Sequence, residues 1–487
     1  MEKFRKFLFR RVDASSLAVF RIGFGMILFA ECMRYLFVFC LECYYLKPII
    51  LFKYYGFEWV EPLPGYGLHM LFAAMAIAAL GITVGYFYRA CIVFFTIAFS
   101  YIFFLDQGRY LNHFYMVILF CLILSVVPAN TYLALDAKRR PSISNSRIPY
   151  WPLFLLGAQV EIILIHAGLV KINADWLNLE PLRTWLAARA DFPLIGELFT
   201  QDWSVAVAAY GIIALHLVGA PLLLLKRTRL IVLCIYASFH MLNHFVFVIG
   251  IFPWMTLFAS LILFEPDWPK RFYQWLSSRV YILQGKLFAA ADSDAETIKL
   301  TGSRAQLVIM SFVVIFLSFQ ILFPLRHWIY PGDVAWNEQG HQFSWRMKLR
   351  SKRGTAMFYV STGDGRSWYV NPSEVLSRLQ ARHVACIPDM TLQFAHYLGK
   401  VWQARGASDV KVTVDAQCSL NGRPLQQIID PDVNLLAQKR SLGHADWILP
   451  LTTPLPNPRL QVRTSSSTDR DAAIDDDGLS GDPGTSD

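Results

Sequence analysis

The stretch EIILIHAGLVKINADW, from Glu161 to Trp176, begins as an apolar helix of the kind that a lipid bilayer accepts. It ends in a lysine, an asparagine, an aspartate and a tryptophan. A lysine at the end of such a run is either an anchor that extends its ammonium to the headgroups or a reactive group held at the membrane edge. The prediction of both fold and function therefore centres on Lys171.

The whole chain shares the apolar character of this stretch. Of its 487 residues, 55% are hydrophobic and 17% are charged, whereas soluble domains carry about 25% charged residues. This composition predicts a polytopic membrane protein. The net charge of +9 is typical of Lys and Arg in cytoplasmic loops, and no nucleic-acid motif is visible, so we do not expect a nucleic acid as partner.

Apolar runs long enough, or nearly long enough, to span a bilayer predict about nine transmembrane helices in a domain of residues 1–325. They lie at about 17–40, 68–87, 89–105, 113–133, 150–170, 204–225, 229–249, 251–264 and 306–325. The basic N-terminus, MEKFRKFLFRR, precedes a run without a small-residue cleavage site, which indicates an uncleaved first span.

The charges of the loops predict the orientation. If the N-terminus is cytoplasmic, the inner segments carry 19 Lys and Arg and the outer segments carry 6, as the positive-inside rule requires. An odd number of spans then places the C-terminal part outside the cytoplasm.

After about residue 326 the pattern changes to that of a small extracytoplasmic α+β domain, residues 326–460. Strand-like runs surround a Gly-Asp-Gly and an Asn-Gly turn, and amphipathic helices lie between them. Cys386 and Cys418 would form a disulfide there if the region is extracytoplasmic, whereas Cys40 is among five cysteines beside apolar runs that we expect to be small core residues. Residues 461–487 are polar and acidic, which predicts a disordered tail.

The predicted topology brings polar and ionisable residues from three helices to the extracytoplasmic side, namely Asn112, His113, Lys171, His240, Asn243 and His244. Lys171 is either an anchor, alone or paired with Asp175 four residues on, or a desolvated amine that acts as a base. His113 is either a helix-start residue or a functional group. The HxxxH spacing of His240 and His244 suits a metal, although a lone pair is more often structural.

Five segments in the same order carry a resemblance to a known family: DQGRYLNHFYM (106–116), HAGLVKINADW (166–176), SFHMLNHFVFVIGIFPWMTLFASLILFEPDWPKR (238–271), PLRHWIYPGDVAWNEQGHQFSWRMKL (324–349) and NPSEVLSRLQARH (371–383). Over about residues 10–455 the chain resembles the vitamin K-dependent gamma-glutamyl carboxylases, also called the HTTM membrane domain family.

The resemblance implies a mechanism. Lys171 would deprotonate vitamin K hydroquinone or menaquinol, whose reaction with O₂ generates a base strong enough to remove a gamma proton from a glutamate of a protein or peptide substrate. CO₂ then adds to the glutamate, the step that His113 would assist. Asn112 would contact the quinone ring, His240 and Asn243 would help to bind it, and four further residues would cap the pocket: His327, Trp336, Trp345 and Met347. No metal is expected.

Other interpretations stay open. The region of His327 to Met347 could equally be an aromatic interfacial belt and domain core. The animal members are longer, and Val170 stands where they have a second lysine, so the chain could form the quinol epoxide without carboxylation. It could also be a non-catalytic scaffold or a transporter, for which polar groups at the bilayer midplane would be the sign, or a histidine-metal oxygenase. The acceptor, the quinone and the oligomeric state are not predicted.

Overall fold

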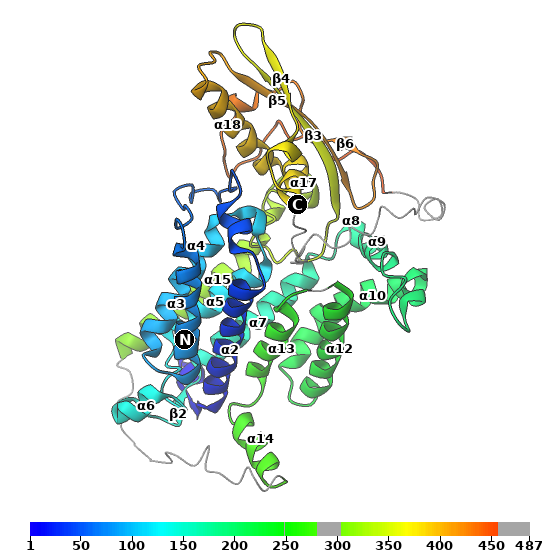
Figure 1. Cartoon of the computed structure of the whole chain (residues 1–487). Coiled ribbons are helices and arrows are strands. Elements are labelled where there is room, and N and C mark those ends of the chain that lie inside the picture. Colours follow the sequence, from blue (N-terminus) through cyan, green and yellow to red (C-terminus); the bar gives the residue numbers. More distant parts are fainter. Residues whose placement is uncertain (248, 280–302, 456–487) are drawn as a thin grey trace.

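The computed structural model describes residues 1–247, 249–279 and 303–455. In these residues, a bundle of apolar helices carries a smaller α+β domain at one end (Figure 1). The tail of residues 461–487, predicted to be disordered, lies outside the described residues.

Seven helices of the described chain are long and apolar enough to cross a membrane. They are α2 (Ser15–Phe37), α3 (Gly67–Val84), α4 (Tyr88–Leu105), α7 (Trp151–Leu169), α10 (Asp202–Ala214) with its continuation through a π turn (Leu215–Gly219) and α11 (Ala220–Leu223), α12 (Arg229–Phe247) and α15 (Ser303–Leu322). Two shorter apolar helices, α5 (Asn112–Val126) and α13 (Phe252–Ser260), join them. The helical membrane architecture agrees with the prediction, but nine complete spans are not confirmed, because these two fall short of the roughly 20 residues that a bilayer requires.

The end of the bundle opposite the α+β domain holds short elements: α1 (Glu2–Phe9), the paired strands β1 (Arg11–Asp13) and β2 (Arg147–Pro149), α6 (Leu135–Arg139) and α14 (Trp268–Ser277) (Figure 1). These elements come from the basic segments that the sequence assigned to the cytoplasmic side. These basic segments therefore lie together, at the end of the bundle away from the α+β domain.

The α+β domain contains one antiparallel sheet with the strand order β4-β3-β5-β6. The strands are β3 (Lys352–Ser361), β4 (Ser367–Val370), β5 (Lys411–Leu420) and β6 (Gln426–Gln427). The two predicted turns connect β3 to β4 and β5 to β6. Every second residue of β5 is buried, as expected for a strand with one face on a core, and α17 (Arg378–Cys386) and α18 (Pro388–Ala404) lie along that sheet (Figure 1).

The first outer loop of the bundle completes the core of this domain. Phe52, between α2 and α3, is fully buried in the same apolar cluster as Phe358 of β3. The backbone N–H of Lys53 donates to the Gln393 side chain over 2.8 Å, and the Gln380 side chain donates to the carbonyl of Ile50 over 2.8 Å. The two parts of the chain are therefore packed together through more than their covalent connection.

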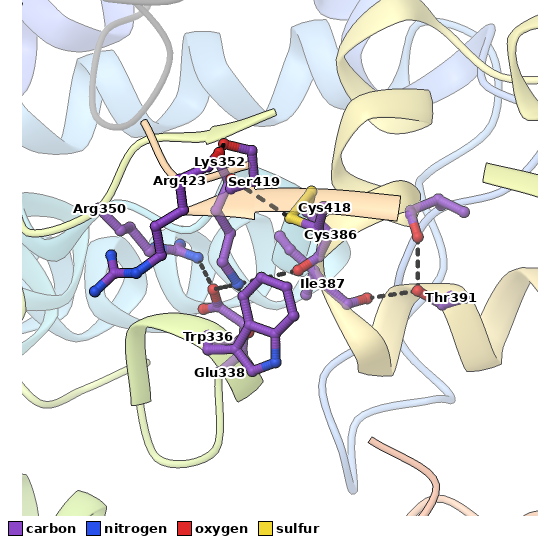
Figure 2. Close-up of a disulfide and its surroundings, with 11 residues drawn as sticks. Trp336, Glu338, Arg350, Lys352, Cys386, Ile387, Thr391, Cys418, Ser419 and Arg423 are labelled. Atoms are coloured by element: carbon purple, nitrogen blue, oxygen red, sulfur yellow. Dashed lines mark hydrogen bonds and ion pairs between the residues drawn. A yellow bond between two sulfur atoms is a disulfide. The ribbon is translucent and has the colours of Figure 1, made fainter. Parts of the chain in front are cut away.

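The structure contains two disulfides, one in a buried core and one in an exposed loop. Cys386 of α17 and Cys418 of β5 are joined inside the domain core, as the sequence suggested, next to Lys352 and Glu338 (Figure 2). Cys40 is joined to Cys43 in the short loop after α2, where both residues are exposed. The expectation that Cys40 is a small core residue is wrong, because α2 ends at Phe37 and leaves Cys40 outside the apolar bundle.

A buried ion pair fastens the domain to the segment that follows α7. Asp175, in the short helix α8 (Ala174–Leu177), accepts from both terminal nitrogens of Arg423 over 2.6 and 2.7 Å and from the side chain of Asn421 over 2.7 Å. Asp175 is 5% exposed and Arg423 is 8% exposed. Such a pair contributes little over an apolar contact, but the loss of one partner leaves an uncompensated buried charge.

We therefore expect Arg423→Met to destabilise the full chain by about 3–5 kcal/mol. The matched control is Arg366→Met, which removes an arginine from an ion pair on the domain surface and should leave the melting temperature unchanged. Thermal unfolding of the purified protein in detergent provides the measurement. Equal melting temperatures for the two variants would show that the buried pair does not hold the domain.

Candidate active site

Lys171 lies just beyond the last turn of α7 and is only 5% exposed. Its Nζ donates hydrogen bonds to the carbonyl of Ala167 over 3.1 Å and to the carbonyl of Met347 over 3.2 Å. A snorkelling anchor would expose its ammonium, and Asp175, the alternative partner, makes its bidentate ion pair with Arg423. The burial contradicts the anchor interpretation and agrees with a desolvated amine.

The loop that covers Lys171 has an unusual backbone. Phe343, Trp345 and Lys348 have φ angles of 60°, 54° and 51°, a conformation that costs free energy in residues other than glycine and persists where the surroundings enforce it. Trp345 is fully buried and stacks on Tyr115 of α5 with ring centroids 4.9 Å apart. This packing holds the loop against the bundle and places the Met347 carbonyl over the lysine.

The start of α5 contributes Asn112 and His113, which are 4% and 3% exposed. The Asn112 side chain accepts a hydrogen bond of 3.0 Å from the Tyr110 hydroxyl. The ring of His113 lies 6.2 Å from that of Phe252, at the start of α13. Both predicted residues are thus buried polar groups at the domain-facing end of the bundle.

A chain of ring contacts runs from His113 toward Lys171. Phe252 also contacts His240 of α12, with centroids 6.0 Å apart, and Tyr236 contacts both His240, at 6.0 Å, and His216 of the π turn, at 5.8 Å. His216 packs on the backbone of α7 at Gly168, three residues before Lys171. The sequence analysis missed His216, although a histidine within a predicted span is the same signal that singled out His240.

Three other predicted site residues, Trp336, His327 and Asn243, are not part of this chain of ring contacts in the described residues. Trp336 is part of the α+β core and donates its indole N–H to the carbonyl of Leu449 over 2.7 Å, so its prediction as a pocket cap is corrected to a core residue. His327 is buried just beyond α15, and Asn243 is half-buried on α12.

Several buried polar atoms of the ring chain and of the loop over Lys171 have no hydrogen-bond partner among the described residues. They are Nε2 of His113, Nε2 of His240 and Nε1 of Trp345. Buried polar groups without a partner are costly and rare. Their presence beside aromatic rings fits a flat ligand with polar groups at its rim, as a quinol is.

Unpartnered groups also lie deeper in the membrane. Both side-chain atoms of Gln159 and both carboxyl oxygens of Glu161, in the middle of α7, have no partner in the described chain. Lys171 is therefore the outer end of a helix that carries polar groups toward the bilayer midplane.

A cavity of about 1120 Å³ lies between the outer end of the bundle and the α+β domain. None of the nine predicted site residues lines it, but Tyr110, the partner of Asn112, and Tyr115, which stacks on Trp345, form part of its wall. Seven basic and two acidic side chains also line it: Arg109, Arg326, Arg350, Arg378, Arg382, Lys439, Arg440, Glu338 and Asp389. This excess of positive charge suits an anionic ligand.

The pKa values of two histidines in the cavity wall reflect the same positive field. Burial of the ring, together with the positive charges of Arg350 and Arg109, lowers the pKa of His383 to about 3. Burial and the positive charge of Arg350 hold the pKa of His341 well below its ordinary value.

Comparison with known families identifies both parts of the chain. Residues 9–268, more than half of the chain, match the model of the HTTM domain. Residues 305–454 match the model described as vitamin K-dependent gamma-carboxylase, lumenal domain, which supports an extracytoplasmic position for the α+β domain. No solved structure matches the chain.

The lowered pKa of His383 predicts how stability depends on pH. Below its ordinary pKa of 6.5 the unfolded chain binds a proton that the folded chain does not, so this histidine should cost about 1.4 kcal/mol of stability per pH unit down to about pH 3. His383→Gln should lower the slope of unfolding free energy against pH by that amount, whereas the exposed His444→Gln should keep the wild-type slope. Denaturant unfolding between pH 4 and pH 7 tests this, and identical slopes for the two variants would contradict it.

Proposed function

The chain belongs to the vitamin K-dependent gamma-glutamyl carboxylase family, and from this premise we propose that it couples quinol epoxidation by O₂ to the gamma-carboxylation of a protein or peptide glutamate, with Lys171 as the base. The observation that carries the proposal is the burial of Lys171 at the outer membrane edge, next to the turn of α7 on which His216 packs. The quinol is vitamin K hydroquinone or menaquinol.

Lys171 has the properties that removal of a quinol proton requires. A quinol hydroxyl resembles phenol, with a pKa of about 10, so an amine held in a desolvated site is a base of suitable strength. The carbonyls of Ala167 and Met347 accept N–H bonds from Nζ and thereby orient it. Trp345 and the loop around it exclude water, which would otherwise hydrate the amine.

The residues of the ring chain and of the loop over Lys171 fit a quinol. His113 and His240 supply ring nitrogens that lack a protein partner, Trp345 supplies an indole N–H, and Asn112 lies beside His113 at the start of α5. When bound, the quinol supplies the oxygenation chemistry that makes a carbon acid as weak as a glutamate gamma position reactive. His113 would assist the carboxylation half by holding or moving a proton at Nε2.

The basic cavity is the proposed entry for the glutamate-containing substrate. An acidic peptide arrives from the extracytoplasmic side, and the seven basic groups raise its local concentration. A quinol with an apolar tail arrives from the bilayer. Tyr110 and Tyr115 belong to the cavity wall and contact Asn112 and Trp345, so a single layer of side chains separates the cavity from these two residues of the proposed site.

One observation favours a second candidate. Gln159 and Glu161 extend the unpartnered polar groups into the membrane, and polar groups at this depth are typical of transporters. A transporter would not form epoxide, so the experiment on Lys171 separates the two functions. Epoxidation without carboxylation remains the alternative within the enzyme class.

Lys171→Ala should lower epoxide formation by about 10²–10⁴-fold, the usual contribution of a positioned base. The measurement uses purified protein in lipid nanodiscs with reduced phylloquinone or menaquinol and O₂, and quantifies the epoxide by chromatography. Lys226→Ala, which removes an exposed lysine at the opposite end of the bundle, is the matched control. A folded wild type that forms no epoxide would contradict the enzyme proposal and favour transport.

His113→Ala should spare epoxide formation relative to carboxylation, since this histidine is assigned to the second half of the reaction. Incorporation of labelled CO₂ into a glutamate-rich peptide is measured together with the epoxide, and their ratio should fall. His69→Ala, on α3 and outside the ring chain, should keep the wild-type ratio. A parallel loss of both products in His113→Ala would instead assign the histidine to the quinol step.

A further inference from the structure

The disulfide Cys40–Cys43 differs from Cys386–Cys418 in its exposure and in the length of the ring that it closes. Cys386 and Cys418 are 2% and 0% exposed and join elements 32 residues apart. Cys40 and Cys43 are both exposed, and the bond closes a ring of only four residues, CLEC. A short ring contributes less to stability than a long one, and exposed disulfides are commonly those with a catalytic or regulatory role.

Two arginines stack on aromatic residues that flank this pair in sequence, while Arg34 is also paired with Glu31 and the disulfide ring itself contains Glu42. The backbone N–H of Cys43 donates to the sulfur of Cys40 over 3.1 Å. The Arg109 guanidinium lies 3.6 Å from the ring centroid of Tyr44, and the Arg34 guanidinium lies 4.8 Å from the ring centroid of Phe39. An N–H donor and nearby positive charge stabilise a thiolate, the reactive form of a cysteine.

The pair also lies at the basic cavity. Cys43 is part of the cavity wall, and the wall beside it is aromatic, formed by Tyr35, Tyr44, Tyr54, Phe57 and Phe104. Flat aromatic walls suit a quinone ring, which stacks on such side chains. The same cavity reaches Tyr110, the partner of Asn112, so a ring bound near Cys43 is close to the proposed quinol site without entering it.

We propose that Cys40 and Cys43 form a redox-active pair that reduces an oxidised naphthoquinone to the quinol inside this cavity. In the reduced protein the two thiols give two electrons and two protons to the quinone, the S–S bond forms, and the quinone becomes the quinol. An external dithiol then reduces the bond by thiol–disulfide exchange and is itself oxidised to a disulfide.

This activity supplies one of the reactions that the proposed function needs. Epoxidation converts the quinol to the epoxide, so its return to the quinol requires a two-electron removal of the epoxide oxygen as water by another reductant, which gives the quinone. The two-electron reduction of that quinone is the step that this pair performs. The inference rests on the proposed use of a quinol, but its test does not require epoxide formation. The oxidising extracytoplasmic compartment explains why the resting pair is a disulfide.

The test follows one round of quinone reduction under anaerobic conditions. The full-length protein is treated with dithiothreitol, desalted, and mixed with 2,3-dimethyl-1,4-naphthoquinone, whose substituted ring positions prevent addition of a thiol. Quinol formation is followed by absorbance, and the oxidation state of each cysteine is determined by alkylation and mass spectrometry. We expect one quinol for each Cys40–Cys43 pair that returns to the disulfide.

Two variants decide the outcome. The double variant Cys40→Ser, Cys43→Ser should lose quinone reduction, whereas Cys234→Ser, which removes an exposed free cysteine on α12, should keep it. Quinone reduction is measured without O₂ and involves no epoxide, so a failure of the proposed epoxidation would leave this result untouched. A bond that dithiothreitol does not reduce, or thiols that stay reduced in the presence of the quinone, would overturn the proposal, as would a double variant with wild-type activity.

Discussion

The buried carboxylate of Asp175 constrains how the two parts of this chain sit together. Removing a carboxylate from water costs several kcal/mol unless a partner compensates it, and the compensating guanidinium belongs to Arg423, 248 residues away in the α+β domain. Asp175 stands four residues after Lys171. The contact that docks the domain therefore also determines what lies above the lysine, including the carbonyl of Met347.

The docked domain divides the site into two environments. On the bundle side, Lys171 lies among aromatic and histidine side chains from which water is largely excluded. On the domain side, a cavity lined by aromatic and basic side chains faces the extracytoplasmic space. Between them lies the loop of Phe343 to Lys348 with its unusual backbone, which the stacking of Trp345 on Tyr115 holds in place. Under the proposed function, this division lets an apolar quinol and a charged peptide reach one reaction centre from different solvents.

The two disulfides illustrate how position determines the role of a bond. Cys386–Cys418 lies inside a packed core, where it restricts the unfolded chain and is shielded from thiols. Cys40–Cys43 lies in a loop after α2, at the cavity edge and close to two arginines. The CLEC spacing alone would not distinguish these roles, since a short spacing permits a bond but does not place it beside a cavity.

The sequence by itself determined the helical bundle and the two hairpin turns of the domain, and it singled out Lys171, His113 and His240 as candidate site residues, because hydrophobic periodicity, turn residues and ionisable groups inside apolar runs are local signals. Tertiary structure alone decided that His216 joins the ring chain, that Trp336 is a core residue, that Asp175 pairs with Arg423, and that an arginine-rich cavity forms above the bundle. Each of these depends on contacts between segments far apart in the chain, and no local pattern records which distant side chain fills a given space.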